Sequence, residues 1–368
     1  MGKVYSMTIY QDSKRMVGTS TERTSVTVNG LGGWKELGRV SGTASTNMTV
    51  NIGTNPPRYL MYLSDTRPST GNGDANLRLG TTATPIDTGS NYASRLSSDN
   101  NTDAVNASIA YVRVDPNMWN NTTSRFSMGY ITNLESREKL MITKTIDSRG
   151  SSAGTAPDRA EVSGKWTNTS SKINNVTMFN GQGNNWSTTS ELVVLGYDPT
   201  DTHTDNFWEE LASVDVTTGS TISTGDFTAK KYMCVQFYLD ASAISFDWQF
   251  NSSTDTQTST YSGRHANNGV GATGTTDDYT QVNKSVMAEN FGLNASPHFG
   301  NMFIFNNSAT EKLINGNLVN QNTAGASNQP NRSEFTYKWS NTSAQINNIT
   351  MLNSTSVSRF VMKVWGHD

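Results

Sequence analysis

The chain has 368 residues and a formal net charge of −3, which excludes the clear basic excess that nucleic-acid-binding surfaces usually carry. Only 16% of its residues are charged, and Asn, Thr, Ser and Gly take their place, which favours strands, turns and loops over helices because these residues compete with the helical backbone. Its 13 Phe, 13 Tyr and 8 Trp are spread along the chain, which excludes disorder for most of its length.

The first segment, residues 1–33, lies outside the internal repeat of this chain, and we expect it to form an N-terminal extension. It begins MGKVYSMTIYQDSKRM, which lacks the apolar core of a signal peptide. No apolar run in the chain reaches the length of a transmembrane helix. We therefore expect a protein that is made in a cytoplasm, is not secreted and does not enter a membrane.

Two modules follow, because the rest of the chain repeats itself in order. GGWKELGRV, which contains Trp34, returns as NFWEELASV, which contains Trp208. NTSSKINNVTM from Asn168 returns as NTSAQINNITM from Asn341. The differences fall in Gly-, Ser- and Asn-rich stretches, where loops tolerate insertion. This indicates duplication of one module of about 165 residues, a single-domain size. We place the first module at 34–199 and the second at 200–368, joined by the linker YDPTDTHTDN.

Apolar and polar residues alternate within each module with the period of two that marks half-buried strands. In YMCVQFYLD, for example, Met233, Val235, Phe237 and Leu239 share one face. About eight such strands per module predict an all-β chain of two tandem antiparallel β-sandwich domains of jelly-roll type. An immunoglobulin-like sandwich is the alternative. NFWEELAS is compatible with one helical turn, although its counterpart GGWKELGR reads equally well as a first strand.

Two local features predict core positions. In the repeated NTS-x-x-INN-x-TM segment, we expect a turn followed by a strand whose Val176 and Met178, or Ile349 and Met351, face inward. The single cysteine, Cys234, excludes an intrachain disulfide and is expected to be a small buried residue.

The motifs H-E-x-x-H, a P-loop and C-x-x-C are absent from the sequence. Four histidines occur without a recurring partner: His203, His265, His298 and His367. A zinc site is therefore not expected. We predict no catalytic, cofactor-binding or metal-binding residues, and no cofactor.

The linker region is rich in acids. They are Asp198, Asp201, Asp205, Glu209 and Glu210. Their spacing does not match an EF-hand loop, so a solvated acidic linker is favoured over a calcium site.

Two arginines recur in both modules, as the pairs Arg95/Arg264 and Arg159/Arg332. A functional interpretation is that they anchor a ligand or an interface, because the guanidinium donates in a rigid fork. A structural interpretation is that they bridge to a loop carbonyl or to an acid of the Glu161/Glu334 pair. We favour the structural one, because duplicated structural residues are what a shared fold retains.

Several segments resemble modules of structural proteins of tailed phages and related aquatic viruses. They are GGWKELGRV, NYASR, SREKL and ATEKL, PDRAEVSGKWTNTSSKI, ELVVLGYDPTDTHTDNFWEEL and VWGHD. The resemblance covers about residues 32–368 in two copies and is specific at K-W-x-N-T-S and at the terminal G-x-D. It implies a virion component, in the coat, on the capsid surface or in the tail, and it supplies no catalytic residues.

Three hypotheses follow. The first is a non-enzymatic virion structural protein, a capsid coat or decoration component that is assembled in the host cytoplasm and binds other virion proteins. It predicts symmetric oligomers, trimers or larger, built from copies of the chain. The second is a receptor- or carbohydrate-binding tail or spike protein that binds a host surface glycan, since jelly rolls also serve as lectins. Its candidate sugar-stacking residues are Trp186, Tyr261 and Trp365.

The third hypothesis is a glycoside-active enzyme, which needs two carboxylates a few ångströms apart. The acids retained in both modules are few, and they are scattered along the sequence: Glu36/Glu210, Glu138/Glu311, Glu161/Glu334 and Asp198/Asp368. We expect that the chain is not an enzyme.

Overall fold

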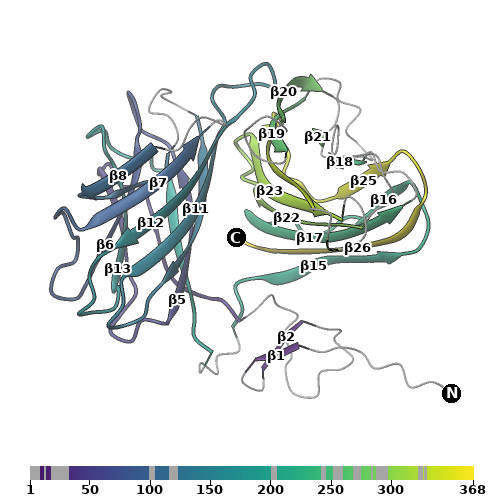
Figure 1. Cartoon of the computed structure of the whole chain (residues 1–368). Helices are drawn as coiled ribbons and strands as arrows, with labels where there is room; N and C mark the ends of the chain where they lie inside the picture. Colours follow the sequence, from purple (N-terminus) through teal and green to yellow (C-terminus); the bar gives the residue numbers. More distant parts are fainter. Residues whose placement is uncertain are drawn as a thin grey trace.

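The computed structural model describes most of the chain as antiparallel β-sheet. The described residues are 9–11, 14–17, 33–98, 104–115, 123–199, 205–241, 246–251, 260–267, 275–282, 285–286, 297–321, 326 and 330–368. Within them every regular element is a strand, and no helix has the length and apolar character needed to cross a membrane. The predicted all-β class with two sandwich domains is confirmed (Figure 1).

A short hairpin precedes the first sandwich. It pairs β1 (Ile9–Gln11) with β2 (Lys14–Val17). The rest of the predicted N-terminal extension before Gly33 lies outside the described residues.

The first module is built from strands β3 to β14. Their bounds are β3 Lys35–Ser41, β4 Asn47–Asn51, β5 Tyr59–Thr66, β6 Ala75–Gly80, β7 Tyr92–Ser98, β8 Ala104–Ile109, β9 Val112–Arg113, β10 Arg125–Thr132, β11 Lys139–Asp147, β12 Asp158–Trp166, β13 Asn175–Asn180 and β14 Glu191–Tyr197. An eight-stranded sheet has the order β3-β14-β5-β10-β11-β12-β7-β8, and a four-stranded sheet has the order β4-β13-β6-β9.

The second module repeats this plan with strands β15 to β26. Their bounds are β15 Glu209–Val216, β16 Thr221–Ser223, β17 Tyr232–Ala241, β18 Phe246–Phe250, β19 Tyr261–Asn267, β20 Thr275–Val282, β21 Ser285–Val286, β22 His298–Phe305, β23 Lys312–Asn320, β24 Asn331–Trp339, β25 Ile349–Asn353 and β26 Val357–His367. The large sheet has the order β15-β26-β17-β22-β23-β24-β19-β20 and the small sheet β16-β25-β18-β21. Each strand therefore has the same neighbours as its counterpart in the first module.

The strand order contains a jelly roll with additions. In the first module the small sheet β4-β13-β6-β9 and the strands β5, β12, β7 and β8 supply the two four-stranded layers of that fold. The hairpin β10–β11 is inserted between β5 and β12, and β3 and β14 extend the large sheet at one edge. The expectation of about eight strands per module was therefore too low. Strands of two or three residues, such as β9 and β16, are too short to show an alternating pattern.

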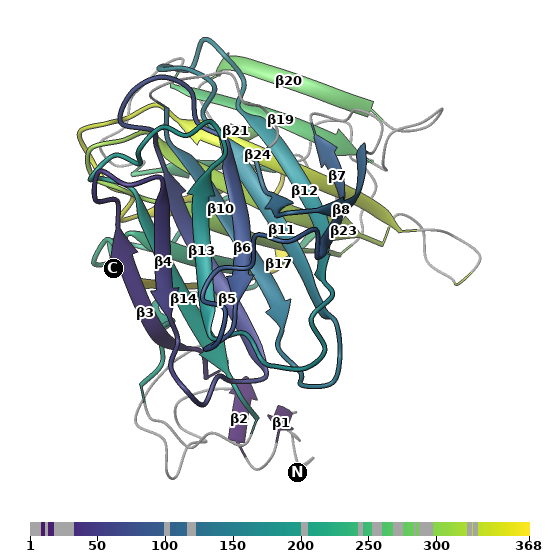
Figure 2. The same cartoon turned by 90° about the vertical axis from the view of Figure 1, so that its left-hand side faces the viewer.

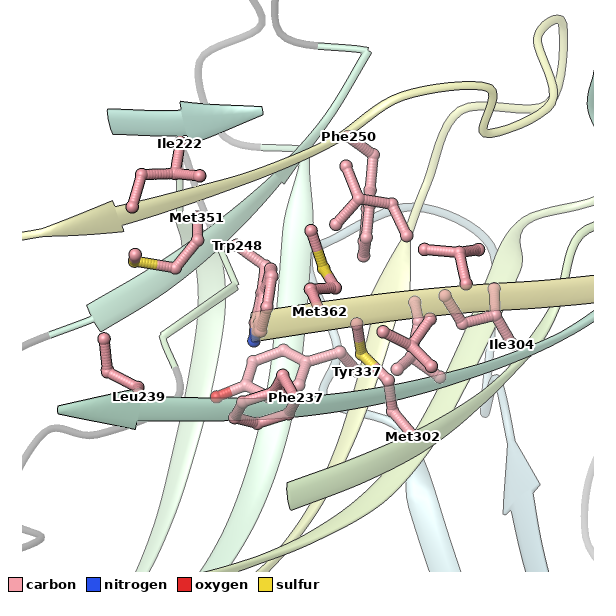
Figure 3. Packing of buried hydrophobic residues seen from close by; sticks show 14 of the residues in the cluster. Ile222, Phe237, Leu239, Trp248, Phe250, Met302, Ile304, Tyr337, Met351 and Met362 are labelled. Carbon is pink, nitrogen blue, oxygen red and sulfur yellow. The ribbon is translucent and has the colours of Figure 1, made fainter. Parts of the chain in front are cut away.

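Each sandwich encloses its own apolar core, and the predicted inward faces are confirmed. Met233, Val235, Phe237 and Leu239 are buried in the second module, where Trp248 of the small sheet meets Phe237 edge-on at a centroid distance of 5.0 Å (Figure 3). The repeated NTS-x-x-INN-x-TM segment also behaves as predicted, because its apolar residues are buried in both copies: Val176, Met178, Ile349 and Met351. Burial of each such side chain contributes about 1.5–3 kcal/mol.

The segment NFWEELAS forms no helical turn. Glu209 begins strand β15, which pairs with β26 through a register shift between Glu210 and Ala212. The backbone N–H and C=O groups of β15 therefore form hydrogen bonds with β26 at the edge of the large sheet. The alternative interpretation of this segment as a first strand was right.

Candidate functional site at the junction of the modules

A third apolar cluster joins the two modules. In Figure 1 strands β5 and β11 lie on the side of the first sandwich that faces the second, and Figure 2 shows the small-sheet strands β4, β13 and β6 on the opposite side, toward the viewer. The cluster is made by the outer faces of the two large sheets. Its buried members are Met61, Leu63, Phe126, Met128, Ile146, Val193 and Leu195 from the first module and Phe207, Trp208, Tyr232, Cys234, Phe303, Phe305, Leu313 and Trp365 from the second.

The sequence builds this junction by making central strands apolar on both faces. In β5 the residues Leu60 and Tyr62 face the core of the first sandwich, whereas Met61 and Leu63 face the second module. Aromatic rings meet in the middle, where Phe126 stacks on Phe305 with centroids 5.6 Å apart. A run that is apolar at every position is typical of a strand covered on both sides. The sequence carries this signal at Leu60 to Leu63, which are apolar at every position, but it does not show what covers the second face of the strand.

Cys234 is buried, as predicted, but it lies in this junction rather than in a sandwich core. Burial raises the pKa of its thiol to about 12. The thiol is therefore neutral at physiological pH and acts as a small apolar group.

Residues after the linker close one side of the junction. Trp208 lies against Phe303, with ring centroids 6.2 Å apart, and Phe207 stacks on His367 at 4.4 Å. The backbone N–H of Phe207 donates to the carbonyl of Trp34 at 2.7 Å. The aromatic residues that mark the start of each repeat thus meet in space.

Ion pairs surround the apolar centre. Arg159 donates to Glu334 of the other module at 2.8 Å, and Arg264 donates to Asp158 at 3.1 Å. Arg332 also contacts Glu334, at 2.6 Å, but its side chain is 58% exposed. The favoured structural interpretation of Arg159 and Arg264 is therefore confirmed, with the addition that both bridges cross between modules. The repeat indicates an acid of the Glu161/Glu334 pair, but it cannot show that the acid which binds Arg159 lies in the other module.

Glu191 is a second polar link. It accepts hydrogen bonds from Lys231 at 2.7 Å and from the Tyr232 hydroxyl at 2.8 Å. Burial raises the pKa of Glu191, but the hydrogen bonds from Lys231 and Tyr232 and the positive charges of Lys231 and Arg39 together outweigh it, and the net shift is downward. The carboxylate is therefore charged and fixed across the junction.

Beside it, Asp65 is almost fully buried, and burial raises the pKa of its carboxyl to about 7 despite the nearby Lys231 and Arg67. This residue gives the junction a group that titrates near neutral pH.

A lysine anchors a loop of the first module. Lys338 is fully buried and donates to the carbonyls of Ser148 and Gly150, each at 2.8 Å. Its neighbour Glu311 accepts from the backbone N–H of Ser152. Burial lowers the pKa of Lys338. The equivalent pair of the first module, Lys165 and Glu138, bond to each other at 2.9 Å while remaining exposed.

The acids considered for glycoside chemistry are held in ion pairs. Glu36 pairs with Arg39 at 2.7 Å, Glu210 with Lys363 at 3.0 Å, and Asp368 with Lys230 at 3.0 Å. Asp198 lies 3.7 Å from Arg58.

Glu161 and Glu334 both line a cleft of about 340 Å³ between the modules. Glu161 is 3.3 Å from Lys144, and Glu334 is bound to Arg159. Carboxylates held by basic partners in this way are suited to fixing the junction.

The three residues proposed to stack on sugars do not fit that role, because all of them are buried. Trp186 donates its indole N–H to the carbonyl of Met178 at 3.3 Å, and the Tyr261 hydroxyl accepts from the backbone N–H of Phe250 at 3.0 Å. Trp365 packs in the junction. The structure contradicts this candidate role for all three residues, and the sequence already counts against two of them, because Trp186 has no counterpart in the second module and Tyr261 aligns with Tyr92 inside an alternating pattern.

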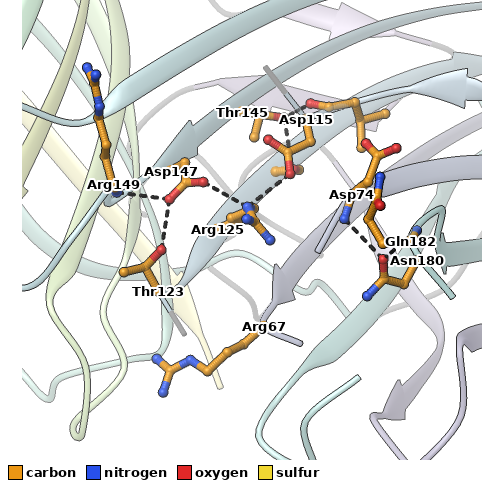
Figure 4. A network of polar contacts seen from close by, with 12 residues as sticks. Arg67, Asp74, Asp115, Thr123, Arg125, Thr145, Asp147, Arg149, Asn180 and Gln182 are labelled. Atoms are coloured by element: carbon orange, nitrogen blue, oxygen red, sulfur yellow. Dashed lines mark hydrogen bonds and ion pairs between the residues drawn. The ribbon is translucent and has the colours of Figure 1, made fainter. Parts of the chain in front are cut away.

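A buried ionic network in the first module was not predicted. Arg125 is fully buried and lies 2.8 Å from Asp147 and 2.9 Å from Asp115 (Figure 4). The second module places His298 and Asn320 at the positions of Arg125 and Asp147, and these two side chains are 3.1 Å apart. The charges of this network are therefore not shared by the two modules, which favours a structural role within the first one.

The remaining histidines and linker acids are scattered. His265 is buried between Tyr279 and Tyr337, and burial lowers its pKa to about 3. Asp201 and His203 lie outside the described residues. Within the described part of the chain, no three His, Cys, Asp or Glu side chains gather in a way that could hold a metal ion.

No family model matches the sequence, and no curated protein matches it. Among solved structures, the chain is similar to domains LG4-5 of the mouse laminin alpha1 chain, with 9% identity over 92% of this chain and 90% of that one, at a TM-score of 0.20. It is similar to the STIV MCP, with 10% identity over 88% and 95%, at a TM-score of 0.16. It is also similar to a turret protein in Sulfolobus turreted icosahedral virus, with 10% identity over 90% and 97%, at a TM-score of 0.11. All three TM-scores are below 0.5.

Proposed function

We propose that this chain is a non-enzymatic structural protein of a virion, a capsid coat or capsid-surface decoration component that assembles into symmetric oligomers. The observation that carries the proposal is the use of the large sheets as packing surfaces. Their outer faces bury the module junction, and the same faces still present apolar side chains to solvent, among them Leu140, Ile142 and Phe299. Contiguous exposed apolar side chains mark surfaces that bind other proteins.

The chemistry of the rest of the chain supports the same proposal. Acids and bases that recur in both modules form ion pairs within and between the modules, as Arg159 and Glu334 do. A weakly charged surface allows many copies to pack closely, because self-repulsion is small. The resemblance of the repeated segments to phage structural modules supports the proposal that the protein acts in a virion assembled in a host cytoplasm.

Electron microscopy of the purified chain in negative stain tests the proposal. Uniform particles of one symmetry are expected, either closed rings, trimers or shells. Isolated two-lobed monomers at every concentration would contradict it.

A receptor- or carbohydrate-binding role is the second candidate, and one feature favours it. The first module has a cleft of about 790 Å³ bordered by polar loop residues that include Asn55, Glu135, Lys172 and Asp198. A glycan array is the test: saturable binding that is lost in the Glu135→Ala variant would move the assignment to this function. An array without signal leaves the structural role as the better account.

A further inference from the structure

The two modules use the same sheet face differently, and the difference is visible position by position. The hairpin β10–β11 of the first module corresponds to β22–β23 of the second, with the same lengths and register. Phe126 is 1% exposed in the junction, whereas its counterpart Phe299 is 53% exposed. Leu313 is fully buried in the junction, whereas its counterpart Leu140 is 56% exposed.

The buried residues Phe126 and Leu313 lie at opposite ends of the outer face of their large sheets. The end of the first module that contains Phe126 and Ile146 is covered by the second module. The end of the second module that contains Phe305 and Leu313 is covered by the first. Each module therefore uses the end of the face that the other leaves free, while both modules bury the middle of the face, where Met61 and Leu195 of the first correspond to Cys234 and Trp365 of the second.

The free end of the first module forms what we call the first patch: Tyr130, Leu140 and Ile142. Tyr130 lies directly opposite Ile142 in the ladder, and all three side chains are among the exposed large apolar residues of the chain. In the second module the counterparts of Tyr130 and Leu140 are Phe303 and Leu313, which are buried against the first module. Two of the three residues of the first patch thus correspond to a surface that already binds a partner within the chain, whereas the counterpart of Ile142 is the polar residue Asn315.

The free end of the second module forms the second patch: Phe299 and Val319. They lie directly opposite each other in the ladder between β22 and β23, and both are exposed. Their counterparts Phe126 and Ile146 are the residues that fill the junction from the first module. The second patch therefore corresponds to the part of the first module that packs against the second module in the junction.

We propose that the first patch of one copy of this chain binds the second patch of another copy, so that the contact between the modules is repeated between chains. This inference rests on the proposed function and names the surface through which the oligomer forms. The two patches differ, so the contact is heterologous. Such a contact gives a closed ring when its rotation closes and a filament when it does not.

Polar residues at the rims fit the same contact. Arg332 lies beside Val319 in the ladder and is the counterpart of Arg159. Glu161 is the counterpart of Glu334, the acid that Arg159 binds across the junction. By repetition, Arg332 of one copy binds Glu161 of the next. The exposed pair Lys165 and Glu138 then takes the place that Lys338 and Glu311 hold in the junction, where they capture a loop of the partner module.

Two variants test the proposal. Leu140→Asp with Ile142→Asp removes the first patch, and Phe299→Asp with Val319→Asp removes the second. Both pairs are on the surface, so unchanged thermal unfolding of each monomer checks that the fold is intact. Val105→Asp is the matched control, because Val105 is a 64% exposed apolar residue on β8, outside both patches.

Sedimentation velocity of the full chain is the readout. We expect the wild type and the Val105→Asp control to assemble and each patch variant to sediment as a monomer, with self-association weakened at least about 30-fold. An equimolar mixture of the two patch variants is expected to form a one-to-one dimer, because each supplies the patch that the other lacks. A contact between identical patches could not be restored in this way.

Three results would overturn the proposal. Assembly of both patch variants like the wild type would place the oligomer contact elsewhere and leave the proposed function standing. Failure of the mixture to form a dimer would refute the pairing of the two patches. A wild type that stays monomeric would count against both the pairing and the proposed structural role.

Discussion

Arg159 and Arg332 occupy the same position in the two copies of the module, yet their surroundings differ. The side chain of Arg159 is 7% exposed at the junction, whereas that of Arg332 is 58% exposed. Both contact the same carboxylate, Glu334. Removing one member of a buried ion pair leaves the other uncompensated, whereas exposed pairs contribute little.

We therefore predict that Arg159→Ala lowers the free energy of unfolding by about 2 kcal/mol, because Glu334 keeps a single, exposed partner. Arg332→Ala, the matched control, is expected to change it by less than about 1 kcal/mol. Urea unfolding of the two variants measures both values. Equal losses would mean that the junction does not depend on the cross-module pair.

Asp65 gives the junction a dependence on pH. Its pKa is raised to about 7 by burial, while the unfolded chain has the ordinary value near 4. Between these values the folded state holds a proton that the unfolded state lacks, so stability is fully present below about pH 4 and falls as the pH rises toward 7. Asp65→Asn removes this term and is expected to stabilise the protein by about 1–4 kcal/mol at pH 8, with little effect at pH 4.

Thermal unfolding of the wild type and of Asp65→Asn across this pH range is the measurement. The melting temperatures of the two proteins should converge as the pH is lowered. Parallel pH profiles would show that Asp65 is not the titrating group.

At the scale of strands, much of the architecture could be predicted because alternation fixes which face of a strand is buried. Met233 to Leu239 and the repeated strand that carries Val176 or Ile349 are examples. The short strands could not be predicted, because two residues such as Val112 and Arg113 carry no period. The junction was missed for a different reason. Whether the second face of a strand is covered depends on the other module, and no pattern within the strand identifies the residues that cover it.

The hairpins β10–β11 and β22–β23 allow this difference to be measured. Phe126→Ala should cost about 3–5 kcal/mol of unfolding free energy, because it leaves a cavity in the packed junction. Phe299→Ala changes the same position of the other module, where the ring is 53% exposed, and is expected to cost less than about 1 kcal/mol in the monomer. Denaturant unfolding at low protein concentration compares the two. Similar losses would contradict the unequal use of the two faces.

The candidate site could be predicted only in part. Arg159, Arg264, Glu161 and Glu334 were identified from the repeat, and the structure brings all four to the junction or to the cleft beside it. An acid of the Glu161/Glu334 pair was proposed as a partner, but that these ion pairs cross between the modules could not be identified, because the repeat describes each copy by itself. The aromatic residues chosen for sugar stacking were wrong, since solvent exposure is a property of packing that composition does not give.

At the scale of the whole molecule, duplication has produced two like modules whose contact is asymmetric. Each large sheet has an end that is buried and an end that is free, and the free ends carry apolar residues such as Leu140 and Phe299. We propose that the two free ends act as complementary surfaces for further copies, which is what assembly into a ring or shell requires. The proposed function therefore depends on self-association of the intact chain.

The mass of the full chain in solution, measured by light scattering over a range of concentrations, tests this claim most directly. We expect a mass that settles at one integer multiple of the 40.1 kDa chain as the concentration rises. A mass that stays at that of one chain throughout the series would contradict it.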